Sequence, residues 1–175
     1  LVFIDRKNDL IELENGEIVS PQMVESRLRY SPFFRDAWIL GEPEGKSLGA
    51  IVIIDYSTVG SWAGKNKIAY TNFSDLSQKP QVYELVRNEI ALINTTMASG
   101  CEITRYVLLH KEFDPDEGEL TRNRKLRRPF LKERYRDLIS ALFGPACEVE
   151  VDAQIKYRDG RTGTVKTVVA IKDVR

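Results

Sequence analysis

The stretch from Pro80 to Gly100 constrains the fold of this 175-residue chain most, because it predicts one long helix with a single apolar face. Pro80 suits the first turn of a helix, and Gly100 supplies a stop signal. Apolar residues recur between them at spacings of three and four, at Val82, Val86, Ile90, Ile93 and Met97. This spacing places them on one side of the helix, which has to pack against another layer of structure.

Apolar, β-rich runs surround that helix. The runs "DAWILG" and "LGAIVIID" bracket residues 42–46 and predict a strand pair, and "ITRYVLLH" predicts another strand. From residue 146 onward the residues alternate with period two about Asp159-Gly160, which predicts a β-hairpin. Because strands and helices mix without a strict βαβ repeat, the sequence indicates an α+β fold. We expect small mixed or antiparallel sheets flanked by helices, with a C-terminal β-hairpin.

The segment from Leu10 to Pro21 predicts a hairpin followed by a helix. Two short extended runs flank Glu14-Asn15-Gly16, which is a good turn signal. Ser20 has the character of an N-cap, and Pro21 suits the first helical position. This helix should end near Ser31-Pro32, since the residue before a proline disfavours the helical conformation.

Two further regions complete the expected elements. Residues 57–75 are less regular and predict a short helix and a loop. A helix beginning near Pro129 should end at Gly144-Pro145. Its apolar face consists of Leu131, Tyr135, Leu138 and Leu142.

Composition narrows the function classes. Lys plus Arg and Asp plus Glu both number 26, so the formal net charge is zero, which argues against a general binder of polyanions. Cys101 and Cys147 lie far apart without a CxxC pattern, so neither a disulfide framework nor a zinc site is indicated. No apolar run approaches the roughly 20 residues that a membrane span needs. A cytoplasmic location is therefore the expectation.

Three short segments imitate functional sites. Residues 41–47 resemble a phosphate-binding loop, but only three residues separate the first glycine from Gly-Lys, where four are needed. Residues 114–118 lack the ligand spacing of a calcium loop, so no metal site is expected. His110 is the single histidine and has no serine or cysteine elbow with it. We expect a plain turn, a solvated acidic turn and a histidine with a structural or surface role.

A dense basic segment runs from Arg122 to Arg128, where five of seven residues are basic. Three interpretations are open from the residues alone. The segment could bind nucleic acid or anionic lipid phosphate, it could be a solvated face at a helix start, or it could contain one catalytic lysine.

Two stretches taken together resemble a known family. Residues 5–26, "DRKNDLIELENGEIVSPQMVES", and residues 118–128, "GELTRNRKLRR", resemble the hinge and the closing motif of the C-terminal domain of adenylate-forming acyl-CoA synthetases. The form "KLRR" with the following "RYRDLI" is most similar to the long-chain fatty acid–CoA ligases. The resemblance covers roughly residues 2–143.

The resemblance implies particular roles for four residues. Lys125 takes the place of the catalytic lysine of adenylation, and Arg6 that of an arginine that contacts the nucleotide. Asn8 falls at the hinge, and Gly16 at the glycine beside the coenzyme A channel. The family hinge residue is usually Asp or Lys, and Arg122 stands where proline is frequent.

The resemblance also implies an organisation. Residues 1–145 would be the mobile C-terminal domain and residues 146–175 a hairpin extension, with the N-terminal domain for ATP and fatty acid absent from this chain. The expected partners are that N-terminal domain and the substrates fatty acid, ATP and coenzyme A, with Mg²⁺ bound mainly through ATP. This reading predicts no nucleic-acid partner and leaves peripheral membrane contact open. The domain is expected to be inactive alone.

Overall fold

The computed structural model describes residues 9–156 and 162–174. Its elements are β1 (Ile11–Glu12), β2 (Ile18–Val19), α1 (Pro21–Leu28), β3 (Phe34–Gly41), β4 (Leu48–Ile54), α2 (Tyr56–Lys65), α3 (Phe73–Ser77), α4 (Pro80–Asn94), β5 (Ile103–Leu108), α5 (Arg128–Arg134), α6 (Arg136–Phe143), β6 (Glu148–Lys156) and β7 (Thr162–Asp173). This arrangement confirms the expected α+β class, with one small and one larger sheet flanked by helices.

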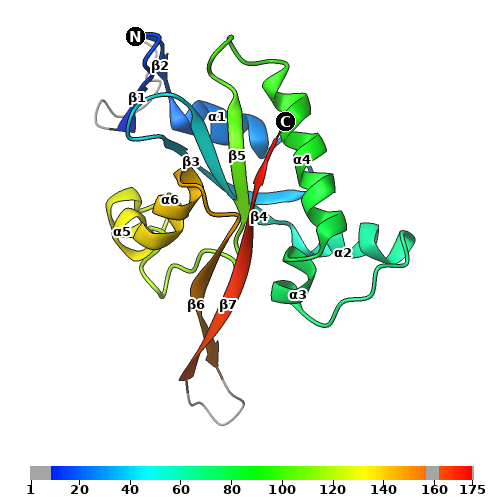
Figure 1. Ribbon diagram of the computed structural model, residues 1–175. Coiled ribbons are helices and arrows are strands. Elements are labelled where there is room, and N and C mark those ends of the chain that lie inside the picture. The colour runs from blue at the N-terminus through cyan, green and yellow to red at the C-terminus, as the bar shows by residue number, and fades with distance from the viewer. Residues whose placement is uncertain (1–8, 157–161, 175) are drawn as a thin grey trace.

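A five-stranded sheet in the order β3-β4-β5-β7-β6 forms the centre of the structure (Figure 1). Strands β3 and β4 pair antiparallel, as their two apolar runs predicted. Strands β4 and β5 are parallel, because the chain returns through α2, α3 and α4 before it enters β5. Strand β7 pairs antiparallel with both β5 and β6. The separate pair β1 and β2 confirms the predicted N-terminal hairpin.

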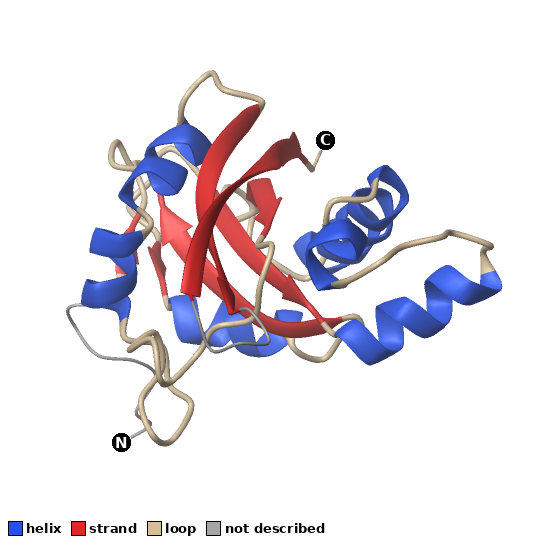
Figure 2. Cartoon of the chain, turned by 90° about the horizontal axis from the view of Figure 1, so that it is seen from below, coloured by secondary structure: helices blue, strands red, loops and turns tan. Residues whose placement is uncertain are grey.

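Helices cover both faces of this sheet (Figure 2). Helices α1, α2 and α4 contribute buried residues such as Val86 to one hydrophobic cluster. Helices α5 and α6 contribute residues such as Leu142 to a second cluster. Successive strand residues point to opposite faces, so Trp38 belongs to the second cluster and Ile39 to the first.

The start of α1 confirms the sequence prediction. Ser20 is the N-cap, and its Oγ accepts a hydrogen bond from the Met23 N–H at 3.3 Å, with Pro21 in the first turn. The helix ends at Leu28, slightly before the expected end near Ser31-Pro32.

The long helix α4 also begins as predicted, but its predicted end was wrong. The helix stops at Asn94, and Gly100 lies in the following loop with φ of 84°. The Asn94 amide nitrogen donates to the Ile103 carbonyl at 2.8 Å, and the Ile103 N–H donates to Asn94 Oδ1 at 2.9 Å. This double hydrogen bond fastens the helix end to the first residue of β5, so the chain leaves the helix there.

Two helical regions differ from expectation in detail. The single helix predicted from Pro129 is divided into α5 and α6 at Tyr135, although its predicted apolar face is buried. Between residues 57 and 75 the structure has α2 and also the start of α3, which the sequence did not predict. Asn72 caps α3, since its Oδ1 accepts a hydrogen bond from the Asp75 N–H at 2.9 Å.

The C-terminal strands confirm the predicted hairpin, with Glu148 opposite Ala170 and Lys156 opposite Thr162. The predicted turn at Asp159-Gly160 lies outside the described residues. The hairpin continues the central sheet, because residues 171–173 of β7 pair with β5. The division into residues 1–145 and 146–175 stays a prediction. Among the described helices, none is both long and apolar enough to cross a membrane.

Candidate functional site

Lys125 lies in a tight, exposed loop just before α5. Leu120 and Leu126 form an antiparallel bridge that closes this loop. The Thr121 N–H donates to the Lys125 carbonyl at 2.8 Å, and the Lys125 N–H donates to Thr121 Oγ1 at 3.1 Å. Arg124 takes the left-handed conformation, with φ of 55°, that turns the chain. The loop backbone is therefore hydrogen-bonded to itself, while the Lys125 residue is exposed to solvent.

A buried carboxylate, Glu119, anchors the start of this loop. Its side chain is fully buried, and it accepts hydrogen bonds from Lys111 Nζ at 2.8 Å and from the Asp114 N–H at 2.9 Å. The Tyr135 hydroxyl donates to Glu119 at 2.5 Å, and Arg134 Nε lies 3.3 Å away. Burial, followed by the negative charge of Glu119, raises the pKa of the Tyr135 hydroxyl, so this group stays a donor.

Arg128 anchors the other end of the basic segment. Its guanidinium donates two hydrogen bonds to the buried Glu25 carboxylate, at 2.9 and 2.8 Å. Glu25 Oε1 also accepts a hydrogen bond from the Ile39 N–H at 2.9 Å. One carboxylate thus joins the start of α5 to α1 and β3, and Arg128 has a structural role.

Two other arginines of the segment are also engaged. Arg127 Nη1 donates to the Gly118 carbonyl at 3.0 Å, and the guanidinium lies over the Phe130 ring at 5.4 Å. Arg124 lies 3.9 Å from the Asp36 carboxylate. Three of the arginines therefore contact groups of the protein itself, and of these three Arg128 is the one that is partly buried.

Burial of Asp36 raises the pKa of its carboxyl group, and the nearby Arg29, Arg124 and Arg35 oppose that rise.

His110 is also buried. Burial, helped by the charge of Lys111, lowers its pKa to about 4, so the imidazole is neutral at neutral pH. Within the described residues neither ring nitrogen of His110 has a hydrogen-bond partner.

Gly16 lies in the turn between β1 and β2, on a different element from Lys125 (Figure 1). Its φ of 82° favours glycine, and no heavy atom lies within 4 Å of the position that a Cβ would take. The hairpin packs against the β3–β4 turn, where the Glu14 N–H donates to the Gly45 carbonyl at 2.8 Å. Arg6 and Asn8 lie outside the described residues, so their predicted roles stay predictions.

Sequence reasoning missed the buried carboxylates Glu25 and Glu119. Neither lies in a pattern that predicts burial, since a lone glutamate in a helix or a loop is usually solvated.

Among the described residues, no group of three or more His, Cys, Asp or Glu side chains is arranged to hold a metal ion.

The sequence model of one family, the AMP-binding enzyme C-terminal domain, matches residues 8–146. This range contains the β1–β2 hairpin, the loop with Lys125 and the helices α5 and α6. The chain therefore belongs to the AMP-binding enzyme C-terminal domain family. Both strands of the C-terminal hairpin, β6 and β7, lie beyond the matched range.

Two proteins that are similar in sequence to this chain are named as a long-chain acyl-CoA synthetase and a long-chain fatty acid–CoA ligase. The chain is 30% identical over 145 residues to "Long chain acyl-CoA synthetase 7, peroxisomal" of Arabidopsis thaliana, covering 82% of this chain and 21% of that protein. It is 26% identical over 144 residues to "Long-chain-fatty-acid--CoA ligase FadD15" of Mycobacterium tuberculosis, covering 82% of this chain and 24% of that protein. The chain thus spans less than a quarter of the length of these relatives.

Solved structures share the fold. The adenylation domain of a carboxylate reductase from Mycobacterium chelonae matches with a TM-score of 0.63 and 23% identity, over 80% of this chain and 20% of that chain. The A-PCP didomain of a carboxylic acid reductase from Segniliparus rugosus, in complex with AMP, matches with a TM-score of 0.61 and 20% identity, over 81% of this chain and 18% of that chain.

Proposed function

We propose that this chain is the C-terminal domain of a long-chain fatty acid–CoA ligase. Such an enzyme converts a fatty acid, ATP and coenzyme A to acyl-CoA, AMP and pyrophosphate through an acyl-adenylate. Family membership and the similarity to long-chain acyl-CoA synthetases support the proposal. The domain would act with a larger N-terminal domain that binds ATP, Mg²⁺ and the fatty acid, and it would be inactive alone. We propose a cytoplasmic location, with peripheral membrane contact as an open possibility.

The presentation of Lys125 is the observation that carries the proposal. Its loop is closed by the Leu120–Leu126 bridge and by hydrogen bonds to Thr121, so the position of the Lys125 backbone is fixed. Within the described part of the chain, the Lys125 ammonium has no carboxylate within ion-pair distance. A flexible stem with a compact positive charge can reach into a partner domain and stabilise negative charge that develops on phosphate and carboxylate oxygens.

The second half of the reaction requires a rotation of this domain. We assign the hinge to Asn8, because asparagine tolerates the unusual backbone dihedrals that a rigid-body rotation passes through. We assign Arg6 to the nucleotide, and Gly16 to the coenzyme A channel. The open space at the Cβ position of Gly16 is compatible with the close approach of a substrate there.

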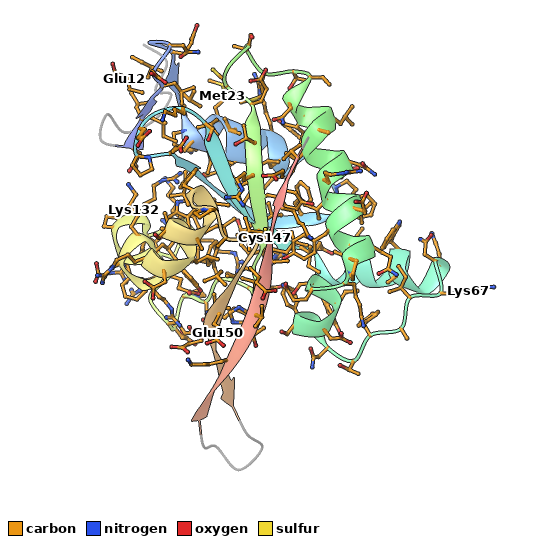
Figure 3. The ribbon with its side chains drawn as sticks, viewed as in Figure 1. Glu12, Met23, Lys67, Lys132, Cys147 and Glu150 are labelled. Atoms are coloured by element: carbon orange, nitrogen blue, oxygen red, sulfur yellow. The ribbon has the colours of Figure 1, made fainter. Side chains whose placement is uncertain are left out.

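The role of Lys125 is tested in a full-length enzyme that contains this domain. Lys125→Gln should lower pyrophosphate release in the adenylation step by about 100-fold or more. Thioester formation from supplied acyl-adenylate should be retained. Lys67→Gln is the control, since Lys67 is exposed in the loop after α2 (Figure 3), whereas Lys125 lies just before α5. Equal losses in both steps for Lys125→Gln would contradict the assignment.

The hinge is tested by Asn8→Pro in the same enzyme. Proline fixes φ and should block the rotation, so thioester formation should fail while pyrophosphate release continues. Loss of adenylation alone would show that Asn8 is not the hinge.

The alternative, a basic module for nucleic acid or anionic lipid, has weaker support. It needs the arginines of residues 122–128 to be available to phosphate, whereas Arg128 pairs with the buried Glu25 and Arg127, although exposed, donates to the Gly118 carbonyl. Binding of the chain to oligonucleotides or anionic vesicles with a steep dependence on salt would favour it.

A further inference from the structure

The loop that carries Lys125 is a short β-hairpin, and its register decides the direction in which Lys125 points. Leu120 and Leu126 pair antiparallel, and both pack into the second hydrophobic cluster. Successive residues of an extended chain point to opposite sides, so the next pair, Thr121 and Lys125, points away from that cluster. Both residues of this outer pair are exposed. A shift of the register by one residue would turn Lys125 inward.

Thr121 makes all the hydrogen bonds that close the tip of this hairpin. Its N–H donates to the Lys125 carbonyl at 2.8 Å, and its carbonyl accepts the Arg124 N–H at 2.8 Å. The Lys125 N–H bonds to the side chain instead, because Thr121 Oγ1 accepts it at 3.1 Å. The hydroxyl of Thr121 therefore supplies the acceptor for the backbone of the lysine itself.

This hydroxyl matters more for position than for stability. The bond between Lys125 and Thr121 is exposed, so water can replace it at small cost in the free energy of folding. The turn beside it is strained, since Arg124 has φ of 55°. Without the hydroxyl, the Lys125 backbone would have more freedom to move. A displacement of a reacting group by about 1 Å can lower a rate about 100-fold.

We propose that Thr121 is a positioning residue for adenylation. Its hydroxyl holds the backbone of Lys125 in the orientation from which the ammonium reaches the reacting oxygens, and it does not itself touch the substrates. The role of Thr121 rests on the proposed function, because it requires Lys125 to act in adenylation. Thr121 has no part in the thioester step.

A set of threonine variants in a full-length enzyme that contains this domain tests the role. Thr121→Val keeps the branched shape but removes the acceptor, so it should lower kcat for pyrophosphate release by about tenfold. The KM values for ATP and fatty acid should change by less than about twofold, since the lost interaction acts in the transition state. Thr121→Ser keeps the acceptor and should retain kcat within about threefold of the parent enzyme.

Thr95→Val is the matched control for the loss of an exposed threonine hydroxyl. Thr95 is exposed at the end of α4, which packs on the other face of the sheet from α5. This variant should leave kcat for pyrophosphate release unchanged. Thioester formation from supplied acyl-adenylate should be retained in Thr121→Val, whereas a merely structural role for Thr121 would lower both half-reactions together.

A double variant tests whether the hydroxyl acts through the lysine. Thr121→Val should cause no further loss of pyrophosphate release in the Lys125→Gln background, because the group that it positions is already absent. A further loss in that background would show that Thr121 acts by another route, and it would overturn the proposal.

Two other results would also overturn the positioning role. One is equal kcat in Thr121→Val and Thr95→Val, and the other is a loss in Thr121→Ser as large as that in Thr121→Val. If Lys125→Gln abolishes adenylation in the same experiments, only the role of Thr121 fails. If Lys125→Gln leaves adenylation intact, the proposed function of the lysine fails, and the role of Thr121 fails with it.

Discussion

Two buried glutamates hold the basic segment at its two ends, and they do so in different ways. Glu119 takes its hydrogen bonds and ion pairs from residues 111–135, which are close to it in sequence. Glu25 joins Arg128, which is 103 positions away, to the backbone of Ile39. Glu119 therefore shapes the connection between β5 and α5, whereas Glu25 fixes where that connection sits on the sheet.

The two glutamates therefore support the Lys125 loop in different respects. Loss of the local anchor should leave several donors without an acceptor and loosen the loop itself. Loss of the long-range anchor should leave the loop shape intact and loosen its attachment to α1 and β3. Measurements of stability and of its pH dependence can separate these two effects.

The largest effect is expected for Glu119→Ala. It leaves Lys111 and the Tyr135 hydroxyl without their buried acceptor, so the free energy of unfolding should fall by about 3–5 kcal/mol. Urea unfolding followed by circular dichroism measures this change. Glu117→Ala is the control, because Glu117 contacts the same Lys111 and Arg134 but is partly exposed. Its loss should stay below about 1 kcal/mol, and equal losses in the two variants would contradict the local anchor.

The next largest effect is a pH dependence of the free energy of unfolding, and it concerns His110, which lies near Glu119. The pKa of His110 is lowered to about 4, with burial as the main cause, and an unfolded histidine has a pKa of about 6.5. The unfolded state therefore binds more protons in this window, and stability should fall as the pH drops from 6.5 to 4, by up to about 3 kcal/mol. Comparison with His110→Leu isolates this part, because His110 is the single histidine. Identical pH profiles for the two proteins would contradict the prediction.

A smaller effect is expected for Glu25→Gln. The amide oxygen can keep the bond from the Ile39 N–H, but the charge-assisted pair with Arg128 is lost, so the free energy of unfolding should fall by about 2 kcal/mol. A double-mutant cycle with Arg128→Met tests the pairing. The two changes should be less destabilising together than their sum, and strict additivity would show that the two side chains are not coupled.

The smallest effect concerns the turn between the two anchors. Arg124 has φ of 55°, which is strained for a residue with a Cβ. Arg124→Gly should raise the free energy of unfolding by about 0.5–1 kcal/mol, less the entropy that glycine gains in the unfolded chain. Arg124→Ala keeps the strain and removes the distant Asp36 contact, so it should change stability by less than about 0.5 kcal/mol. A loss of stability in Arg124→Gly would contradict the strain at this turn.

Local patterns predicted most of the secondary structure. Ser20 with Pro21 predicted the start of α1, and the apolar residues after Pro80 predicted α4, since both signals depend on neighbours in the chain. Predictions failed where distant residues decide. The end of α4 depends on the bonds between Asn94 and Ile103, and the division of α5 from α6 falls at Tyr135, which bonds to Glu119.

The candidate site divides in the same way. Lys125 could be singled out because the residues around it resemble a family motif. The positions of its supports could not be predicted, because a sequence does not show which glutamate is buried or which arginine reaches it. A cleft that is lined by Trp38 and Lys132 could not be predicted either, since β3 and α5 contribute its walls from separate parts of the chain.

Sequence patterns alone indicate the α+β class, the family and the lysine that we propose as catalytic, because periodicity and short motifs are properties of neighbouring residues. The packing of distant segments, by contrast, pairs Arg128 with the buried Glu25 and places Trp38 and Lys132 in the lining of one cleft. Burial and pairing depend on how distant segments pack, and the same arginine can be a solvated charge or a buried tie according to the carboxylate that it meets.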